Sequence, residues 1–206
     1  MNRKLILPVA ILSVIIFSCT KESVKKPAEI TRYSSNDAAR TDAITGYITY
    51  TIKQGQHYSD KSSLKYVSTT EMKFYAKFDQ TAIYTSVIPE NQYDINKLYG
   101  FSEGFNNQYN SARMGWGYSN GAIRLYGYVY SKGVRYSQEI TTVLPGEDIT
   151  CSIKISGSTY IITANGISVT LPRGTTASKA NGWQQYPYFG GNEVAPHNVY
   201  IYIKPF

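Results

Sequence analysis

The chain has 206 residues, of which 42% are hydrophobic and 14% aromatic, including 20 tyrosines, and its formal net charge is +7. The basic residues are scattered rather than clustered, which argues against a nucleic-acid partner. Only two cysteines and two histidines are present, in no recognised metal-ligand spacing, so we expect neither a disulfide framework nor a metal or other cofactor.

The first 18 residues have the layout of a signal peptide. Arg3 and Lys4 precede an apolar run over residues 5–17 that is short for a membrane span. The ending Ile-Phe-Ser-Cys at residues 16–19 resembles a bacterial lipobox, in which the cysteine becomes the lipid-modified first residue. An ordinary signal peptide cleaved nearby is the alternative. We therefore expect an exported bacterial lipoprotein, anchored to the outer membrane only through lipid on Cys19 and facing the periplasm or the cell surface.

Residues 19–42 are expected to form the lipidated cysteine and a flexible tether. From residue 20 this segment is polar and charged, and it has no sustained periodicity. Without Arg3 and Lys4, the 21 basic side chains become 19 against 14 acidic ones, a formal charge of +5. Such an excess suits an acidic polymer without requiring one.

From residue 43 onward the pattern is that of short β-strands separated by Gly, Asn, Pro and Ser clusters. No long helical pattern and no fixed repeat occur in this region. The sequence predicts one all-β domain over residues 43–206, an antiparallel β-sandwich or jelly roll, which we expect to be monomeric. The expected strands are 43–52, 64–78, 111–118, 122–130, 134–143, 149–155, 159–164, 167–171 and 198–206.

Asn120-Gly121 is the strongest turn signal, because both central residues of a type I′ hairpin need a positive φ. Taking these two residues as the loop fixes the register, since side chains alternate between the faces with period two. One face then carries the pairs Ser119–Ala122, Trp116–Leu125, Met114–Gly127 and Ala112–Val129. The other face carries Gly115–Tyr126, Arg113–Tyr128 and Ser111–Tyr130. Asn165-Gly166 indicates a second tight hairpin.

The second face of this hairpin brings together a serine, an arginine, three tyrosines and no carboxylate. Tyrosine favours strands in general, so the tyrosines alone are weak evidence of function. An arginine directly opposite Tyr128 is more specific, and it predicts an anion-binding, proton-transferring surface. Trp116 lies on the apolar face and is expected in the core. Cys151, in its alternating run, is expected to be buried or half-buried.

Three segments resemble, in order, motifs of the polysaccharide lyases of family 14. They are Lys97-Leu98-Tyr99-Gly100, Ser111-Ala112-Arg113 followed by Trp116, and Leu125-Tyr126-Gly127-Tyr128-Val129. The later Tyr188-Phe189-Gly190-Gly191 resembles that family's aromatic-Gly-Gly segment. Family 14 enzymes have a concanavalin-like β-jelly roll and cleave alginate and related glucuronate polymers. The resemblance implies the same fold, an alginate- or glucuronan-like anionic polysaccharide as partner, and a catalytic set of Lys97, Ser111, Arg113, Tyr126 and Tyr128.

A second similarity, to alginate lyases of family 7, rests on Tyr130-Ser131-Lys132 and Tyr136-Ser137-Gln138. The partner motifs of that family are missing from this sequence. In addition, the family's motif normally lies close to the chain end, whereas some 68 residues follow Gln138 here. We interpret Ser131-Lys132-Gly133 as a hairpin turn instead.

The implied reaction is β-elimination on a uronic acid polymer, in which the proton at C5 is removed and the O4 leaving group departs. Arg113 and Lys97 would neutralise the carboxylate and stabilise the developing enolate. We expect these cations to lower the pKa of Tyr128, the candidate base, with Tyr126 as the acid. Ser111 would orient the sugar by hydrogen bonding.

Further substrate contacts are expected from Tyr130 and Arg124, and from Asn192, Glu193 and His197 in the segment before the last strand. We interpret that segment first as a loop entering the last strand, with a rim site or a calcium site as the alternatives, and a lone histidine is usually structural. The same tyrosine-lined face would also serve a noncatalytic glycan-binding lipoprotein, and a structural lipoprotein is a third possibility. A glycosidase is disfavoured because the sequence yields no carboxylate pair.

Overall fold

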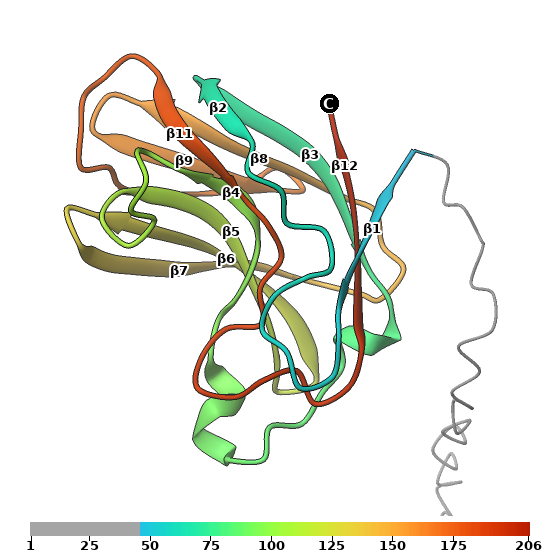
Figure 1. Ribbon diagram of the computed structural model, residues 1–206. Coiled ribbons are helices and arrows are strands. Elements are labelled where there is room, and N and C mark those ends of the chain that lie inside the picture. Colours follow the sequence, from blue (N-terminus) through green and yellow to red (C-terminus); the bar gives the residue numbers. More distant parts are fainter. Residues whose placement is uncertain (1–45) are drawn as a thin grey trace, which may run out of the picture. The chain divides into compact units, whose positions relative to one another are not determined.

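The computed structural model describes residues 46–206, so the predicted signal peptide, Cys19 and the tether lie outside the described residues. Within the described part, two six-stranded antiparallel sheets pack face to face (Figure 1). The first sheet has the order β1 (Ile48–Ile52), β12 (Val199–Pro205), β3 (Glu71–Phe78), β8 (Ile149–Ser156), β9 (Thr159–Ala164) and β10 (Ile167–Pro172). The second has the order β2 (Tyr66–Thr69), β11 (Ala180–Gln185), β4 (Asn96–Ser102), β5 (Ser111–Ser119), β6 (Ala122–Ser131) and β7 (Val134–Val143).

Two short 3-10 helices complete the described elements, η1 (Gln80–Ala82) and η2 (Pro89–Tyr93). No helix in the described part is long and apolar enough to cross a membrane. The architecture is a two-sheet antiparallel jelly roll of the concanavalin type in a single domain, which confirms the predicted fold class.

The hairpin register derived from Asn120-Gly121 is confirmed. Strands β5 and β6 pair Ser119 with Ala122 at the turn, and the pairing continues without a shift to Ser111 and Tyr130. Asn120 and Gly121 have φ values of 51° and 74°, as a type I′ turn requires. The turns at 132–133 and 165–166 also have two consecutive positive φ values, which confirms them as tight hairpins.

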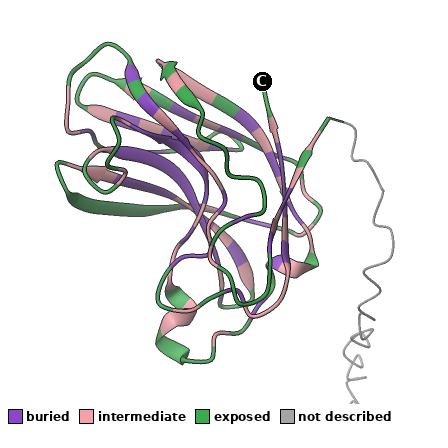
Figure 2. Ribbon diagram, in the orientation of Figure 1, coloured by how far each residue is buried: buried purple, intermediate pink, exposed green. Residues whose placement is uncertain are grey.

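The core lies between the two sheets, where apolar side chains of both inner faces meet (Figure 2). Trp116 is 0% exposed and packs against Phe78 at a ring distance of 5.1 Å, so its predicted place in the core is confirmed. Cys151 is also buried. Strand β7 is exposed over most of its length, as expected for the last strand of its sheet.

Two strands that the sequence did not predict belong to the sheet that carries the site, and one predicted strand is divided between the two sheets. Residues 96–102, which are not among the expected strands, form β4 in the middle of the sheet. Residues 180–185 form β11, although the segment ANGWQQ has no strand-like alternation. The expected strand 64–78 is divided at Thr70 into β2 and β3, which belong to different sheets.

Candidate functional site

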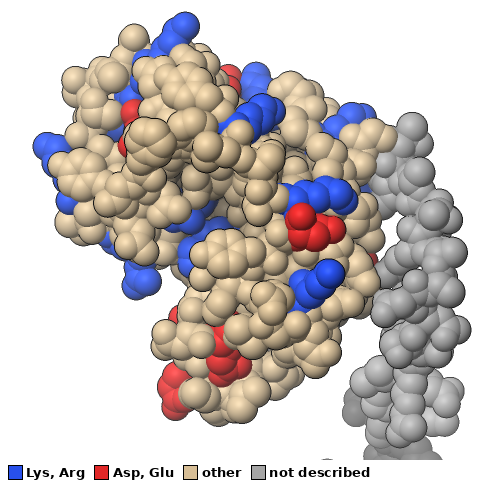
Figure 3. All heavy atoms as spheres, in the orientation of Figure 1, with Lys and Arg blue, Asp and Glu red and all other residues tan. Residues whose placement is uncertain are grey.

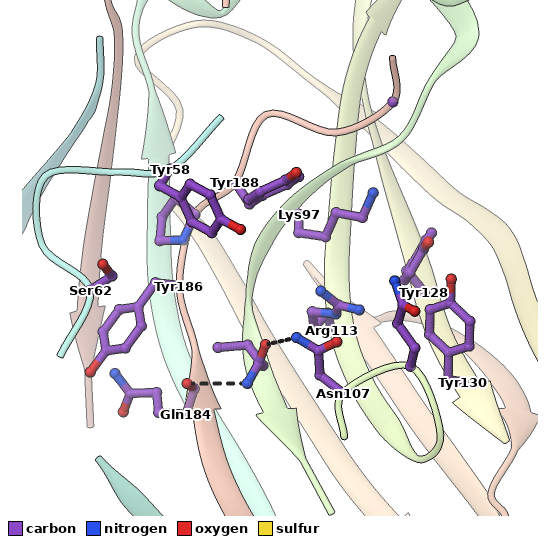
Figure 4. A pocket seen from close by; sticks show the side chains of 14 residues that line it. Tyr58, Ser62, Lys97, Asn107, Arg113, Tyr128, Tyr130, Gln184, Tyr186 and Tyr188 are labelled. Carbon is purple, nitrogen blue, oxygen red and sulfur yellow. Dashed lines mark hydrogen bonds between the residues drawn. The ribbon is translucent and has the colours of Figure 1, made fainter. Parts of the chain in front are cut away.

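A pocket of about 490 Å³ opens on the outer face of the second sheet. Its floor is formed by side chains of β4, β5 and β6, and its walls by the loop before β2, the loop between β4 and β5, and the segment after β11 (Figure 4). The floor residues are Lys97, Arg113, Tyr128 and Tyr130, and the wall residues include Tyr58, Ser62, Asn107, Gln108, Gln185, Tyr186 and Tyr188.

Arg113 is the most unusual side chain in this pocket. It is only 8% exposed, and its Nε is buried without a hydrogen-bond partner. No ion pair of Arg113 occurs in the described part of the chain, and burial lowers the pKa of its guanidinium. The guanidinium lies 5.3 Å from the centre of the Tyr128 ring. A buried cation without a counter-ion is costly, so this arrangement is suited to receiving an anion.

Lys97 reaches the same face because of a bulge in β4. The register shifts between Lys97 and Tyr99, so that Leu98 and Tyr99 both point into the core and Lys97 remains on the outer face. Its Nζ donates to the carbonyl of Ile95 at 2.8 Å and lies 4.8 Å from the centre of the Tyr128 ring. Burial, together with the charge of Arg113, lowers the pKa of Lys97 to about 8.

The pKa of Tyr128 corrects one expectation. We expected the neighbouring cations to lower it, but burial and the hydrogen bond with Tyr130 raise it, and the opposing effect of Arg113 is smaller. The rings of Tyr128 and Tyr130 meet edge to face with centres 5.9 Å apart. Both phenols line the pocket, and Tyr128 is fully protonated at neutral pH.

Tyr188 forms the wall opposite these two phenols (Figure 4). The backbone N–H of Tyr188 donates to the carbonyl of Lys97, and that of Lys97 donates to the carbonyl of Tyr188, both at 2.9 Å. This bridge continues the pairing of β11 with β4. The ring of Tyr188 stacks on His57 with centres 5.3 Å apart and meets Tyr58 edge to face at 4.9 Å. Burial raises the pKa of Tyr188. The resemblance had marked this segment, but nothing in the sequence indicated Tyr58, which comes from a loop.

Gly190 and Gly191 explain why the chain turns so closely above Lys97. A Cβ on Gly190 would lie 2.4 Å from the backbone oxygen of Ile95, which accepts from the Lys97 Nζ, and Gly191 has a φ of +81°. Both positions therefore need glycine, one for space and one for backbone conformation.

Ser111 and Tyr126 lie on the predicted face but do not line the pocket. Ser111 is fully buried, and its Oγ donates to the carbonyl of Asn107 at 2.6 Å, so it holds the pocket wall in place. Beside Tyr126, the chain at Ile95 crosses over the sheet so closely that a Cβ on Gly115 would lie 2.6 Å from the Ile95 side chain. This crossing segment occupies the outer face next to Tyr126.

The remaining predicted contacts lie outside the pocket in the structure. Arg124 forms an ion pair with Glu139 at 2.8 Å. Glu193 accepts hydrogen bonds from the backbone of Val87 and Ile88 and from the Asn91 side chain, so it caps the start of η2. The ring of His197 bonds the carbonyl of Thr81, and the backbone of Asn192 donates to Asp94. These contacts give each residue a structural partner.

Carboxylates are lacking among the described residues that line the pocket. Glu103 is engaged with Arg173, Glu139 with Arg124, and Glu193 with the start of η2, so these three glutamates are held outside the pocket. No group of three or more His, Cys, Asp or Glu side chains suited to a metal ion occurs in residues 46–206. On the face shown in Figure 3, basic side chains lie within a central hollow, and a group of acidic side chains lies below it.

Comparisons with known proteins show the fold and leave the family open. No family model matches the chain, and no curated protein matches its sequence. Among solved structures, alginate lyase AlyC3 matches with a TM-score of 0.51 at 9% identity over 76% of this chain and 72% of that one. Its complex with dimannuronate matches with a TM-score of 0.50 at 10% identity, covering 77% and 72%. LamAcat from Zobellia galactanivorans matches with a TM-score of 0.48 at 10% identity, covering 78% and 76%.

Proposed function

We propose that the protein binds an anionic, uronic acid polysaccharide in the pocket around Arg113 and cleaves it by β-elimination, as a lyase similar to those of family 14. The observation that carries this proposal is the buried guanidinium of Arg113, which lies among tyrosines and whose Nε has no hydrogen-bond partner. The jelly-roll fold shared with an alginate lyase that binds dimannuronate supports it. Alginate- or glucuronan-like chains are the substrate class with the matching carboxylate.

In this mechanism Arg113 holds the substrate carboxylate through paired hydrogen bonds, which makes the C5 proton more acidic. Lys97 has the pKa nearest to neutral, at about 8, and its neutral amine takes the C5 proton. The electron pair of the C5–H bond forms the C4–C5 double bond as the C4–O4 bond breaks. Tyr128, which burial keeps protonated, then gives its proton to O4. The proton on Lys97 returns to the phenolate and resets the site.

A noncatalytic glycan-binding function is the second candidate, and one observation favours it. At neutral pH Lys97 is mostly protonated, and the pKa values of Tyr128 and Tyr188 are raised by burial, so these three groups are poor bases. In that case Lys97 and Arg113 both hold carboxylates, and the tyrosine rings form the sugar-binding walls.

The two candidates are separated by product formation. Incubation of the purified chain with alginate and with polyglucuronate should give the ultraviolet absorbance of an unsaturated uronate, and the Lys97→Met variant should bind these polymers without producing it. Binding without absorbance by the unmodified chain, at every pH tested, would favour the second candidate. Failure to bind either polymer would refute both.

We further propose that the protein acts as an exported lipoprotein, held at the outer membrane by lipid on Cys19. The lipobox-like ending at residues 16–19 supports this placement. Replacement of Cys19 by Ser should release the protein from the membrane fraction and abolish labelling with a radioactive fatty acid. Retention of the label would refute the assignment.

A further inference from the structure

A cluster of three aromatic side chains, two exposed and one partly exposed, lies on the same sheet as the pocket, at the edge formed by β2 and β11. Trp183 of β11 is directly opposite Tyr66 of β2, and their rings meet edge to face with centres 5.7 Å apart. The ring of Phe105, from the loop between β4 and β5, lies 5.3 Å from that of Trp183. We name Tyr66, Phe105 and Trp183 the aromatic platform.

The exposure of the platform is not explained by folding. Phe105 is 87% exposed and Tyr66 is 59% exposed, whereas other aromatic rings of this domain are buried in its core. Exposed aromatic side chains that contact one another form an apolar patch, and such patches mark binding sites more often than single exposed residues do. We therefore expect the platform to bind a ligand.

The platform is continuous with the pocket through two chain segments. Along β11, Trp183 is two residues from Gln185, which lines the pocket, and residues two apart in a strand point to the same face. Along the loop, Phe105 is two residues from Asn107, which also lines the pocket. The Asn107 side chain donates to that of Gln185 at 3.0 Å, which joins the two segments between platform and pocket (Figure 4).

We infer that the aromatic platform is an accessory subsite, on which a sugar ring of the polysaccharide stacks when its neighbours along the same chain occupy the Arg113 pocket. This inference rests on the proposed function and extends it to polymer length. Trp, Tyr and Phe rings provide flat apolar surfaces, and a pyranose ring offers a face of C–H bonds that matches them. The pocket recognises the carboxylate by charge, and the platform contacts the uncharged part of a more distant residue.

The two tryptophans of the chain make this testable by fluorescence. Trp116 is fully buried, so acrylamide, a neutral quencher, reports on Trp183. We would mix the full chain with alginate oligosaccharides of three and of six residues, and record affinity and quenching by stopped flow before turnover. The hexasaccharide should protect Trp183 from acrylamide, whereas the trisaccharide should bind without protecting it.

The Phe105→Ala variant should weaken hexasaccharide binding by about three- to tenfold, the loss of one aromatic contact, and leave trisaccharide binding as it was. The exposed Phe206, which packs on Tyr75 instead, provides the matched control, and Phe206→Ala should change neither affinity.

The outcomes separate this inference from the proposed function. Suppose that the unmodified chain binds both oligosaccharides without protection of Trp183, and that Phe105→Ala binds each of them as tightly as the unmodified chain does. The platform is then not a subsite, and the proposed function stands. If sedimentation shows a dimer that Phe105→Ala dissociates, the occupant is a second copy and the inference is wrong. If neither oligosaccharide binds, the proposed function fails and the inference fails with it.

Discussion

Replacement of Arg113 by Met should abolish polysaccharide binding and, at the same time, make the protein more stable. The methionine keeps the apolar stem and removes a buried guanidinium whose Nε has no partner. An unsatisfied buried group costs about 1–3 kcal/mol. The contact with the Tyr128 ring, 5.3 Å away, offsets about 0.5–2 kcal/mol of that cost. The free energy of unfolding should therefore rise by about 1 kcal/mol.

Arg173 is a matched control within the same chain, because it is equally buried but fully bonded. Its side chain is 0% exposed and forms two parallel hydrogen bonds with Glu103, at 2.7 and 2.8 Å. It also donates to the carbonyls of Gly157, Ala177 and Lys179. Arg173→Met would leave the Glu103 carboxylate buried without its cation, so we expect the free energy of unfolding to fall by about 3–5 kcal/mol.

Urea unfolding followed by tryptophan fluorescence gives the free energy of unfolding of each variant, and binding is measured by retardation in alginate-containing gels. The two variants should change stability in opposite directions. If Arg113→Met destabilises the protein as much as Arg173→Met does, Arg113 is a structural residue and the reasoning about the pocket is wrong. Unchanged retardation of Arg113→Met would refute the binding role alone.

Three further predictions concern the same sheet. Lys97→Met should raise the free energy of unfolding at pH 7 by about 1–2 kcal/mol, since the folded state disfavours the charged amine. The gain is no larger because the amine is partly exposed and solvent screens its charge. Because the pKa is about 8 in the folded state and higher in the unfolded state, this gain should fade as the pH rises above 8, as urea unfolding at several pH values would show. Tyr128→Phe should lower kcat by about 100-fold or more, whereas Tyr126→Phe, outside the pocket, should change it by less than about threefold; equal losses would contradict the site. Ser111→Ala should lower the free energy of unfolding by about 1 kcal/mol, because the hydrogen bond to Asn107 is lost. It should also raise KM rather than lower kcat, because the pocket wall at Asn107 becomes less fixed. A lower kcat at unchanged KM would assign Ser111 a direct role.

The sequence predicted the hairpin half of the site because period-two alternation and an Asn-Gly turn are local signals. Arg113, Tyr128 and Tyr130 follow from that register alone, and the pairing of β5 with β6 confirms it. The place of Lys97 could not be derived in this way. Strict alternation from Gly100, which pairs with Arg113, would point Lys97 into the core, and only the bulge at Leu98 reverses it.

Tyr126 shows a second limit of local reasoning. Its face was predicted correctly, but the pocket does not extend along the whole face. The segment at Asp94 and Ile95 lies over Gly115 and Gly117, so the two glycines allow a loop to cover the sheet beside Tyr126. Strand β11 was missed because ANGWQQ combines a glycine with polar residues and lacks alternation. Tertiary contacts set all of these features, and no window of sequence contains them.

The pH dependence of the pocket separates catalysis from binding, because the two functions need opposite states of Lys97. As a base the amine must be neutral, so kcat/KM should rise with pH and level off above about 8. As a second carboxylate-binding group it must be charged, so affinity should fall as the pH rises through the same value. A bound carboxylate next to Lys97 would also raise its pKa, which would weaken it as a base. Catalysis therefore requires the carboxylate to lie on Arg113. Measurement of kcat/KM and of affinity from about pH 6 to about pH 10 decides between the two, and a flat profile in both would show that Lys97 takes part in neither.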